Sequence, residues 1–270
     1  MSDVDEVLAG TRRWCVVEGD CIDVMRSLPD KSIAHLISDP PYSEHTHNSV
    51  RRGGSVHAPP VTTGGPQRPI VSTSTVLGFA HVTAAERRSV ASACARLVQR
   101  WSMVFSDDHG NALWRRSFQA AGLEFVRTMH WIRRGGAPQF TGDRPGTGVE
   151  PITLAHPFPP GRKRWNGGGK IGLYDHPIVS GREGGDREHP TQKPVSLMLD
   201  LVADFTDPDD IILDPFAGSG TTGVAALRLN RRCILIEKQA KYVELIRERL
   251  EAEEHMSTLT ATRAMQEALF

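Results

Sequence analysis

Cysteine is scarce in this sequence, which has four cysteines in 270 residues and no CxxC pair. Their scatter indicates small buried hydrophobic side chains and excludes a disulfide framework. The close pair His45 and His47 has no cysteine or HExxH pattern beside it, so no metal site is expected. The four cysteines are Cys15, Cys21, Cys94 and Cys233.

Long apolar runs are also missing. No stretch approaches the roughly 20 apolar residues that span a bilayer, and the acidic residues 1–10 lack the apolar core of a signal peptide. Apolar residues make up 39% and charged residues 24% of the chain, as in ordinary globular proteins. We therefore expect a cytoplasmic protein with no membrane partner, folded as one large α/β domain that includes an insertion.

The chain has no net charge, but its charges are segregated. Residues 41–189 carry 19 Lys and Arg against 11 Asp and Glu, whereas 1–40 and 190–270 are both acidic. A polyanion would therefore bind the middle of the chain, although a solvated basic face produces the same pattern.

Hydrophobic periodicity predicts alternating strands and helices, and this alternation implies a mostly parallel sheet covered on both faces. Residues 43–75 interrupt it with a long loop rich in Gly, Pro, Ser and Thr, and 158–188 interrupt it again with a loop-rich binding element. Strands are expected at 14–18, 33–38, 103–105, 124–132, 152–155, 211–214 and 233–237, and helices at 22–28, 84–100, 112–121, 194–205, 219–229 and 240–250.

A glycine-rich turn covers residues 214–223, with the sequence DPFAGSGTTG, and joins a predicted strand to a helix. Glycines let the backbone approach a ligand closely at a helix start. Glu237, at the end of the next strand, suits a carboxylate that accepts hydrogen bonds from ribose hydroxyls. The turn also matches the GxGxxG pattern of nicotinamide enzymes. However, too little sequence follows Glu237 to complete a dinucleotide fold, so the sheet must be assembled in permuted order, which disfavours a nicotinamide enzyme.

Asp39, Pro40, Pro41 and Tyr42 follow a predicted strand, where ligands of open α/β sheets bind. These residue types suit methylation of an exocyclic base amine, whose lone pair is delocalised into the ring. The Asp39 carboxylate and the Pro40 carbonyl can accept the two amine hydrogens and localise that lone pair. Tyr42 can stack on a base removed from the duplex, and positioning then contributes most of the catalysis. The alternative is a proline-terminated strand with an incidental tyrosine.

These motifs, in this order, resemble the β-type amino DNA methyltransferases, in which a DPPY tetrad precedes the recognition region and an FxGxG turn follows it. Residues 189–194, HPTQKP, resemble the segment that leads into the cofactor half of that family, and residues 19–21 resemble its contact with the cofactor adenine. For Asp20 the alternative is a helix N-cap. The resemblance covers most of residues 14–250.

The resemblance implies a Rossmann-like α/β methyltransferase fold with a mostly parallel seven-stranded sheet in permuted order and a small inserted DNA-recognition region. It implies S-adenosylmethionine as the cofactor and S-adenosylhomocysteine as the product, with Lys193 and its neighbours binding the methionine carboxylate. The implied catalytic residues are the tetrad, Asp39, Pro40, Pro41 and Tyr42. The implied cofactor-binding residues are Asp20, Cys21, Asp39, Lys193, Pro194, Asp214, Phe216, Ala217, Gly218, Ser219, Gly220, Thr221, Thr222, Glu237 and Lys238.

The expected organisation has four parts. Residues 1–156 form the first part of the catalytic domain and include the mobile loop 43–75. Residues 157–188 form the target-recognition insert, 189–252 the cofactor-binding part and 253–270 a C-terminal tail. Basic and aromatic residues around the insert are expected to bind DNA, although Trp165 would equally suit a core position. The expected DNA-binding residues are Arg51, Arg52, Arg133, Arg134, Arg162, Lys163, Arg164, Trp165 and Lys170.

The leading hypothesis is N6-adenine methylation of double-stranded DNA. N4-cytosine methylation is the nearest alternative, since the family tends to use SPPY for cytosine and DPPY for adenine without a strict border. RNA methylation, a non-catalytic DNA-binding regulator and a nicotinamide oxidoreductase are the more distant alternatives. Because the insert is short, a homodimer is expected to read the target site. No nuclease motif is visible, so any restriction endonuclease would be a separate protein.

Overall fold

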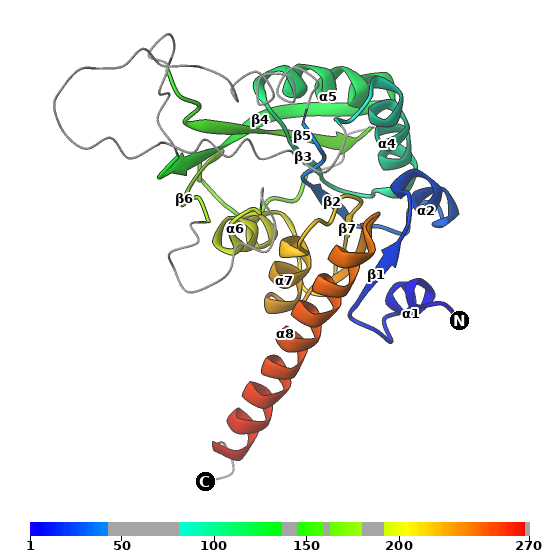
Figure 1. Ribbon diagram of the computed structural model, residues 1–270, viewed down its shortest axis with the longest axis vertical. Helices are drawn as coiled ribbons and strands as arrows, with labels where there is room; N and C mark the ends of the chain where they lie inside the picture. The colour runs from blue at the N-terminus through cyan, green and yellow to red at the C-terminus, as the bar shows by residue number, and fades with distance from the viewer. Residues whose placement is uncertain (43–80, 137–144, 159–162, 180–191, 268–270) are drawn as a thin grey trace, which may run out of the picture.

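An eight-stranded sheet forms the centre of the protein (Figure 1). The computed structural model describes residues 1–42, 81–136, 145–158, 163–179 and 192–267, with side chains up to residue 256. The strand order is β1-β8-β7-β2-β3-β5-β4-β6, and only β5 runs antiparallel to its neighbours. The strands are β1 Trp14–Glu18, β2 His35–Ser38, β3 Ser102–Phe105, β4 Leu123–Arg134, β5 Val149–Pro157, β6 Leu173–Pro177, β7 Ile211–Asp214 and β8 Arg232–Glu237.

The predicted mostly parallel sheet in permuted order is confirmed, but it has eight strands and not seven. The additional strand is β6, which lies within the segment expected to be loop-rich and pairs with β4 at the sheet edge. Its sequence, Leu-Tyr-Asp-His-Pro, has no β-branched residue. Local propensity therefore did not indicate a strand. The hydrogen bonds and side-chain packing gained by pairing with β4 stabilise the strand instead.

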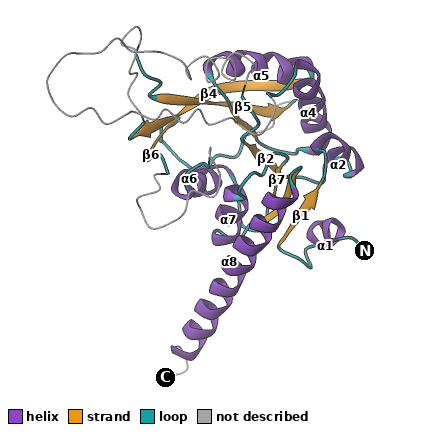
Figure 2. Ribbon diagram, viewed as in Figure 1, coloured by secondary structure: helices purple, strands orange, loops and turns teal. Residues whose placement is uncertain are grey.

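Helices cover both faces of the sheet (Figure 2). Successive strand residues alternate between two cores, as Ile212 and Leu213 of β7 illustrate. The core that contains Leu213 includes side chains of α1, α2, α4 and α5, and the core that contains Ile212 includes side chains of α6, α7 and α8. The helices are α1 Asp3–Ala9, α2 Cys21–Ser27, α4 Ala84–Leu97, α5 Asp108–Ala120, α6 Val195–Phe205, α7 Thr221–Arg228 and α8 Ala240–Glu267.

The C-terminal helix α8 is longer than expected. The sequence pattern ended it at Leu250, with a tail over 253–270, because the apolar periodicity stops there. The helix instead continues to Glu267 and extends away from the sheet (Figure 1). Residues 251–256, EAEEHM, are rich in strong helix formers, which favour helix without needing an apolar face.

The pairing of β2 with β7 brings distant parts of the chain together. Leu36 of β2 lies opposite Leu213 of β7 in a parallel register. Parallel neighbours end at the same edge of a sheet, so Asp39, after β2, and the glycine turn, after β7, meet there. This arrangement confirms that the tetrad and the glycine turn line neighbouring strand ends of one sheet.

Candidate cofactor and target-base site

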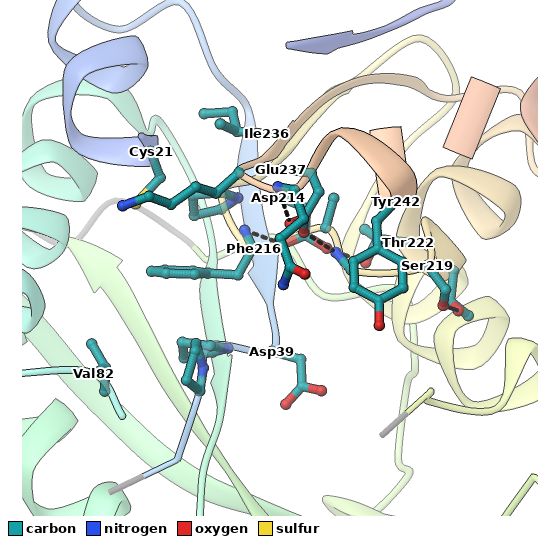
Figure 3. A pocket seen from close by; sticks show the side chains of 18 of the residues that line it. Cys21, Asp39, Val82, Asp214, Phe216, Ser219, Thr222, Ile236, Glu237 and Tyr242 are labelled. Carbon is teal, nitrogen blue, oxygen red and sulfur yellow. Dashed lines mark hydrogen bonds between the residues drawn. The ribbon is translucent and has the colours of Figure 1, made fainter. Parts of the chain in front are cut away.

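A cavity of about 510 Å³ opens at the carboxyl ends of β7, β8 and β2, a volume ordinary for a small-molecule site. Figure 3 shows Asp39 at one end of this cavity and Cys21 with Ile236 at the other. The residues between them come from the glycine turn and from the segment that follows β8, including Phe216, Glu237 and Tyr242. One cavity therefore joins the two motifs found in the sequence.

The glycine turn is fixed by the carboxylate of Asp214. This carboxylate is buried and accepts hydrogen bonds from Ser38 Oγ at 2.7 Å, Thr222 Oγ1 at 2.6 Å and the Phe216 amide at 3.1 Å. Gly220 caps α7 with φ of 78°, where a Cβ would also meet Ile246 Cγ1 at 3.0 Å. Burial raises the pKa of Asp214 to about 6, against the effect of its hydrogen bonds. Asp214 therefore has a structural role, linking the two central strands to α7.

Glu237 lies at the end of β8 with both carboxylate oxygens oriented by backbone amides. Gly218 donates to Oε2 at 3.0 Å and Gln239 donates to Oε1 at 2.9 Å. Each oxygen keeps a lone pair, so a pair of ribose hydroxyls can still bind. Asp20 caps α2 through Ile22 at 3.0 Å and also lines the cavity, so both roles considered for it are compatible with its position.

The end of the cavity away from Asp39 is largely apolar. Ile236 lies there beside Cys21, and Phe216 lies between these residues and Asp39 (Figure 3). Burial raises the pKa of the Cys21 thiol to about 12, so this thiol stays protonated and is not a nucleophile. A flat, mostly apolar group such as a purine ring suits these surroundings.

Asp39 and Lys193 form an ion pair beside the tetrad tyrosine. Lys193 Nζ lies 2.6 Å from Asp39 Oδ2 and donates to the Tyr42 hydroxyl at 3.0 Å. The second oxygen, Asp39 Oδ1, is buried and has no hydrogen-bond partner among the described residues. A buried acceptor without a partner is costly, so a donor from a bound ligand would compensate this oxygen.

Glu150, at the start of β5, completes this cluster and was missed by the sequence analysis. Its carboxylate, 6% exposed, lies 2.8 Å from Lys193 Nζ and accepts a hydrogen bond from the Tyr42 hydroxyl. A single Glu before a proline carries no recognisable motif, and its partners lie far away in the sequence. Only the folded sheet identifies it as a site residue.

Burial and charge set the ionisation of this cluster. Burial raises the pKa of Asp39 to about 6; the charge of Lys193 opposes this shift and that of Glu150 adds to it. Burial disfavours the Lys193 ammonium, but Asp39 and Glu150 outweigh burial and raise its pKa. Burial also raises the pKa of Tyr42, so its hydroxyl remains a donor. Near neutral pH the cluster contains an ionised Asp39, a cationic Lys193 and a neutral Tyr42.

The cavity includes the tetrad and every predicted cofactor residue except Pro194 and Gly220, which act as helix caps behind it. Lys193 lines the cavity, but its described contacts are with the Asp39 cluster. Its role toward a methionine carboxylate stays a prediction. Gln192 of the HPTQKP segment also lines the cavity. Further lining residues that no motif indicated are Ile22, His81, Val82, Glu86, Met198, Ile236, Gln239 and Tyr242.

Those predicted DNA-binding residues that the structure describes lie at two edges of the sheet. Arg133 and Arg134 end β4 at the same edge as Asp39, and Arg133 Nε lies 3.8 Å from Glu150 Oε2. Arg51, Arg52 and Arg162 are outside the described residues, as is the loop 43–75.

The basic run of the insert lies at the opposite edge. Lys163 pairs with Glu124 at the start of β4, and Arg164 lies 3.2 Å from Asp207. The Trp165 ring packs edge-on against Phe205, with centroids 4.6 Å apart. Lys170, for its part, lies 2.7 Å from Asp204 of α6. These contacts hold the insert against the domain, and a DNA role for these four residues stays a prediction.

Two classes of feature are absent from the described part of the chain. None of its helices combines the length and apolar character needed to cross a bilayer. No group of three or more His, Cys, Asp or Glu residues in the same ranges is arranged to hold a metal ion.

The fold and the cavity define a methyltransferase-like α/β domain, and solved structures support this class. The complex of M1.HpyAVI with SAM aligns with a TM-score of 0.61 at 20% identity, covering 88% of this chain and 98% of that one. The cytosine-N4-specific PvuII DNA methyltransferase aligns with a TM-score of 0.65 at 16% identity, covering 88% and 86%. At these identities the likeness shows the fold.

The sequence comparison identifies the family. A family model described as DNA methylase, covering N6 and N4 methyltransferases, matches residues 33–248, so the chain belongs to this DNA methylase family. The type II methyltransferase M2.MboI of Moraxella bovis is 27% identical over 88% of each chain. The type II methyltransferase M.HinfI of Haemophilus influenzae is 24% identical, covering 87% of this chain and 67% of that protein.

Proposed function

We propose that this protein is a type II, site-specific DNA methyltransferase that methylates N6 of adenine in double-stranded DNA. The observation that carries the proposal is the unsatisfied Asp39 Oδ1 in the cavity that the glycine turn also lines. The similarity to two type II methyltransferases supports the substrate class. Asp at position 39, where a cytosine enzyme more often has Ser, favours adenine.

The cofactor is S-adenosylmethionine, which supplies an electrophilic methyl group. Glu237 suits the ribose hydroxyls, and the apolar end around Phe216 and Ile236 suits the adenine ring. The cavity volume and the donor and acceptor pattern of its walls fit a nucleoside with an amino-acid tail.

On the target side, Asp39 Oδ1 and the Pro40 carbonyl accept the two hydrogens of the base amine. Tyr42 stacks on the base, which has been rotated out of the duplex. As the amine nitrogen becomes cationic it grows acidic, so the ionised Asp39 can take up the proton that this nitrogen loses. Positioning and hydrogen bonding at Asp39 therefore supply the catalysis that this chain contributes.

The decisive experiment expresses the protein in a host without DNA methylation, then combines modified-base sequencing with mass spectrometry of nucleosides. N6-methyladenine at one short recurring sequence is the expected result. N4-methylcytosine alone would overturn the choice of base, and equal methylation of single-stranded RNA would overturn the choice of polymer.

We further propose that the protein acts as a homodimer in the cytoplasm and that any cognate endonuclease is a separate protein. The short insert supports the dimer, since one copy would contact few base pairs. A monomeric mass in solution at full activity would contradict it.

A further inference from the structure

The carboxylate of Glu150 has more partners than its position at the start of β5 requires. It comes from β5, two strands away from β2 and on the far side of β3, yet it reaches both Lys193 and Tyr42. Burying a carboxylate is costly unless cations and donors compensate for it. The fold provides these partners from three other segments: Arg133 on β4, Tyr42 after β2 and Lys193 before α6.

Lys193 connects the two carboxylates of the cluster. Its ammonium lies 2.6 Å from Asp39 Oδ2 and 2.8 Å from Glu150 Oε1. Asp39 therefore has one oxygen bound to Lys193 and the other, Oδ1, without a partner among the described residues. Glu150 is thus a second carboxylate bound to the same ammonium, and it helps to hold Lys193 on Asp39 Oδ2, which leaves Oδ1 for the base.

Tyr42 is fixed by the same carboxylate. Its hydroxyl donates to Glu150 and accepts from Lys193 at 3.0 Å. Because this bond anchors the far end of the phenol, it limits rotation of the ring that would stack on the base. Arg133 Nε lies 3.8 Å from Glu150 Oε2 and adds a second cation beside this carboxylate.

We propose that Glu150 is a positioning residue of methyl transfer: by holding Lys193 and the Tyr42 hydroxyl, it makes Asp39 present one ionised oxygen to the base amine. This inference rests on amine methylation at the tetrad, but it does not depend on whether the base is adenine or cytosine.

The charges that face Asp39 make the proposal measurable. They come from Lys193 before α6, Glu150 on β5 and Asp214 on β7, with Arg133 on β4 behind Glu150. Lys193 lowers the pKa of Asp39, and the negative charge of Glu150 raises it. Removing that charge therefore lowers the pKa of Asp39, and the acidic limb of the kcat profile should move to lower pH.

The test compares wild type with Glu150→Gln, Glu150→Ala and Tyr42→Phe on duplex DNA at saturating cofactor. Glu150→Gln keeps the shape and should move the acidic limb to lower pH. Glu150→Ala removes both anchors and should reduce kcat by roughly tenfold or more, with the KM for cofactor little changed. Tyr42→Phe keeps the negative charge of Glu150, so it should reduce kcat without moving the acidic limb to lower pH.

Asp204→Asn is the matched control. Asp204 is also a buried carboxylate bound by a lysine and a tyrosine, Lys170 at 2.7 Å and Tyr174 at 3.1 Å, but it lies on α6 outside the cavity. It should lower the melting temperature without moving the acidic limb. The inference is overturned if the acidic limb of the kcat profile lies at the same pH in Glu150→Gln and wild type. It is also overturned if the Glu150 variants lose stability but keep their kcat. An error in the proposed target base would be detected by a different measurement, since mass spectrometry of the nucleosides would then show N4-methylcytosine instead of N6-methyladenine.

Discussion

Lys193 Nζ lies 2.6 Å from Asp39 Oδ2, although 154 positions separate the two residues in the chain. The contact connects the segment before α6 with the tetrad that follows β2. It joins two of the motifs on which the family resemblance rests, the tetrad and the HPTQKP segment, into one charged cluster. The catalytic behaviour of Asp39 therefore depends on residues from both halves of the chain.

Asp39→Asn should reduce kcat about 100-fold or more, because a positioned carboxylate is replaced by an amide that accepts and donates differently. In the wild type, the raised pKa of Asp39 means that its ionised form is lost as the pH falls through about 6. We expect kcat to decline below that pH, measured by transfer of a labelled methyl group. Undiminished transfer in Asp39→Asn would disprove the role of the tetrad.

Asp214→Asn should change how stability depends on pH. The folded-state pKa of Asp214 is raised to about 6 from 3.8, so folding favours its protonated form. The stability that Asp214 contributes relative to Asn is present below about pH 4 and lost as the pH rises through about 6. A shift of this size corresponds to about 3 kcal/mol. Urea unfolding of both proteins across this range measures it, and parallel curves would contradict the prediction.

Glu237→Gln should weaken binding of S-adenosylmethionine by about tenfold or more, since a charged acceptor for hydroxyl groups is lost. Titration calorimetry measures this loss directly. The matched control is Glu18→Gln, because Glu18 ends β1 opposite Glu237 in the strand register and does not line the cavity. Equal affinity of Glu237→Gln and Glu18→Gln for S-adenosylmethionine would show that Glu237 does not bind the cofactor.

Arg133→Ala should weaken DNA binding and reduce the slope of log affinity against log salt by about 1, as expected for a phosphate contact. Arg133 lies at the tetrad edge of the sheet, 34% exposed. Fluorescence anisotropy at several salt concentrations provides the measurement. Arg164→Ala, at the opposite edge, decides whether that edge also contacts DNA: an unchanged slope there would restrict the interface to the tetrad edge.

The sequence was sufficient to predict the central strands and two main motifs, the tetrad and the glycine turn. Each of these motifs follows a short apolar run that ends before a Pro or Gly. The sequence places Asp39 and Gly218 each after a predicted strand, and the pairing of β2 with β7 brings the two strand ends together. The same reasoning identified Glu237, since an acidic residue after an apolar strand is a local signal.

The remainder depended on contacts between distant residues. Glu150 has no local signal, and only the register of β5 brings it to Lys193. The basic run at Lys163 and Arg164 indicated a DNA surface, whereas the structure pairs these residues with Glu124 and Asp207. Composition could not distinguish these alternatives, because a cation paired inside the chain and a cation available to phosphate look alike in sequence.

The pairing of β7 between β8 and β2 has a consequence for biosynthesis. Until the ribosome has released residues 211–237, the strand at 35–38 has an unpaired edge, and β1 has no neighbour in the sheet at all. Exposed edges of this kind promote association with other chains. The N-terminal strands therefore stay unprotected until residues 211–237 have been synthesised, so chaperones that bind the nascent chain should raise its folding yield.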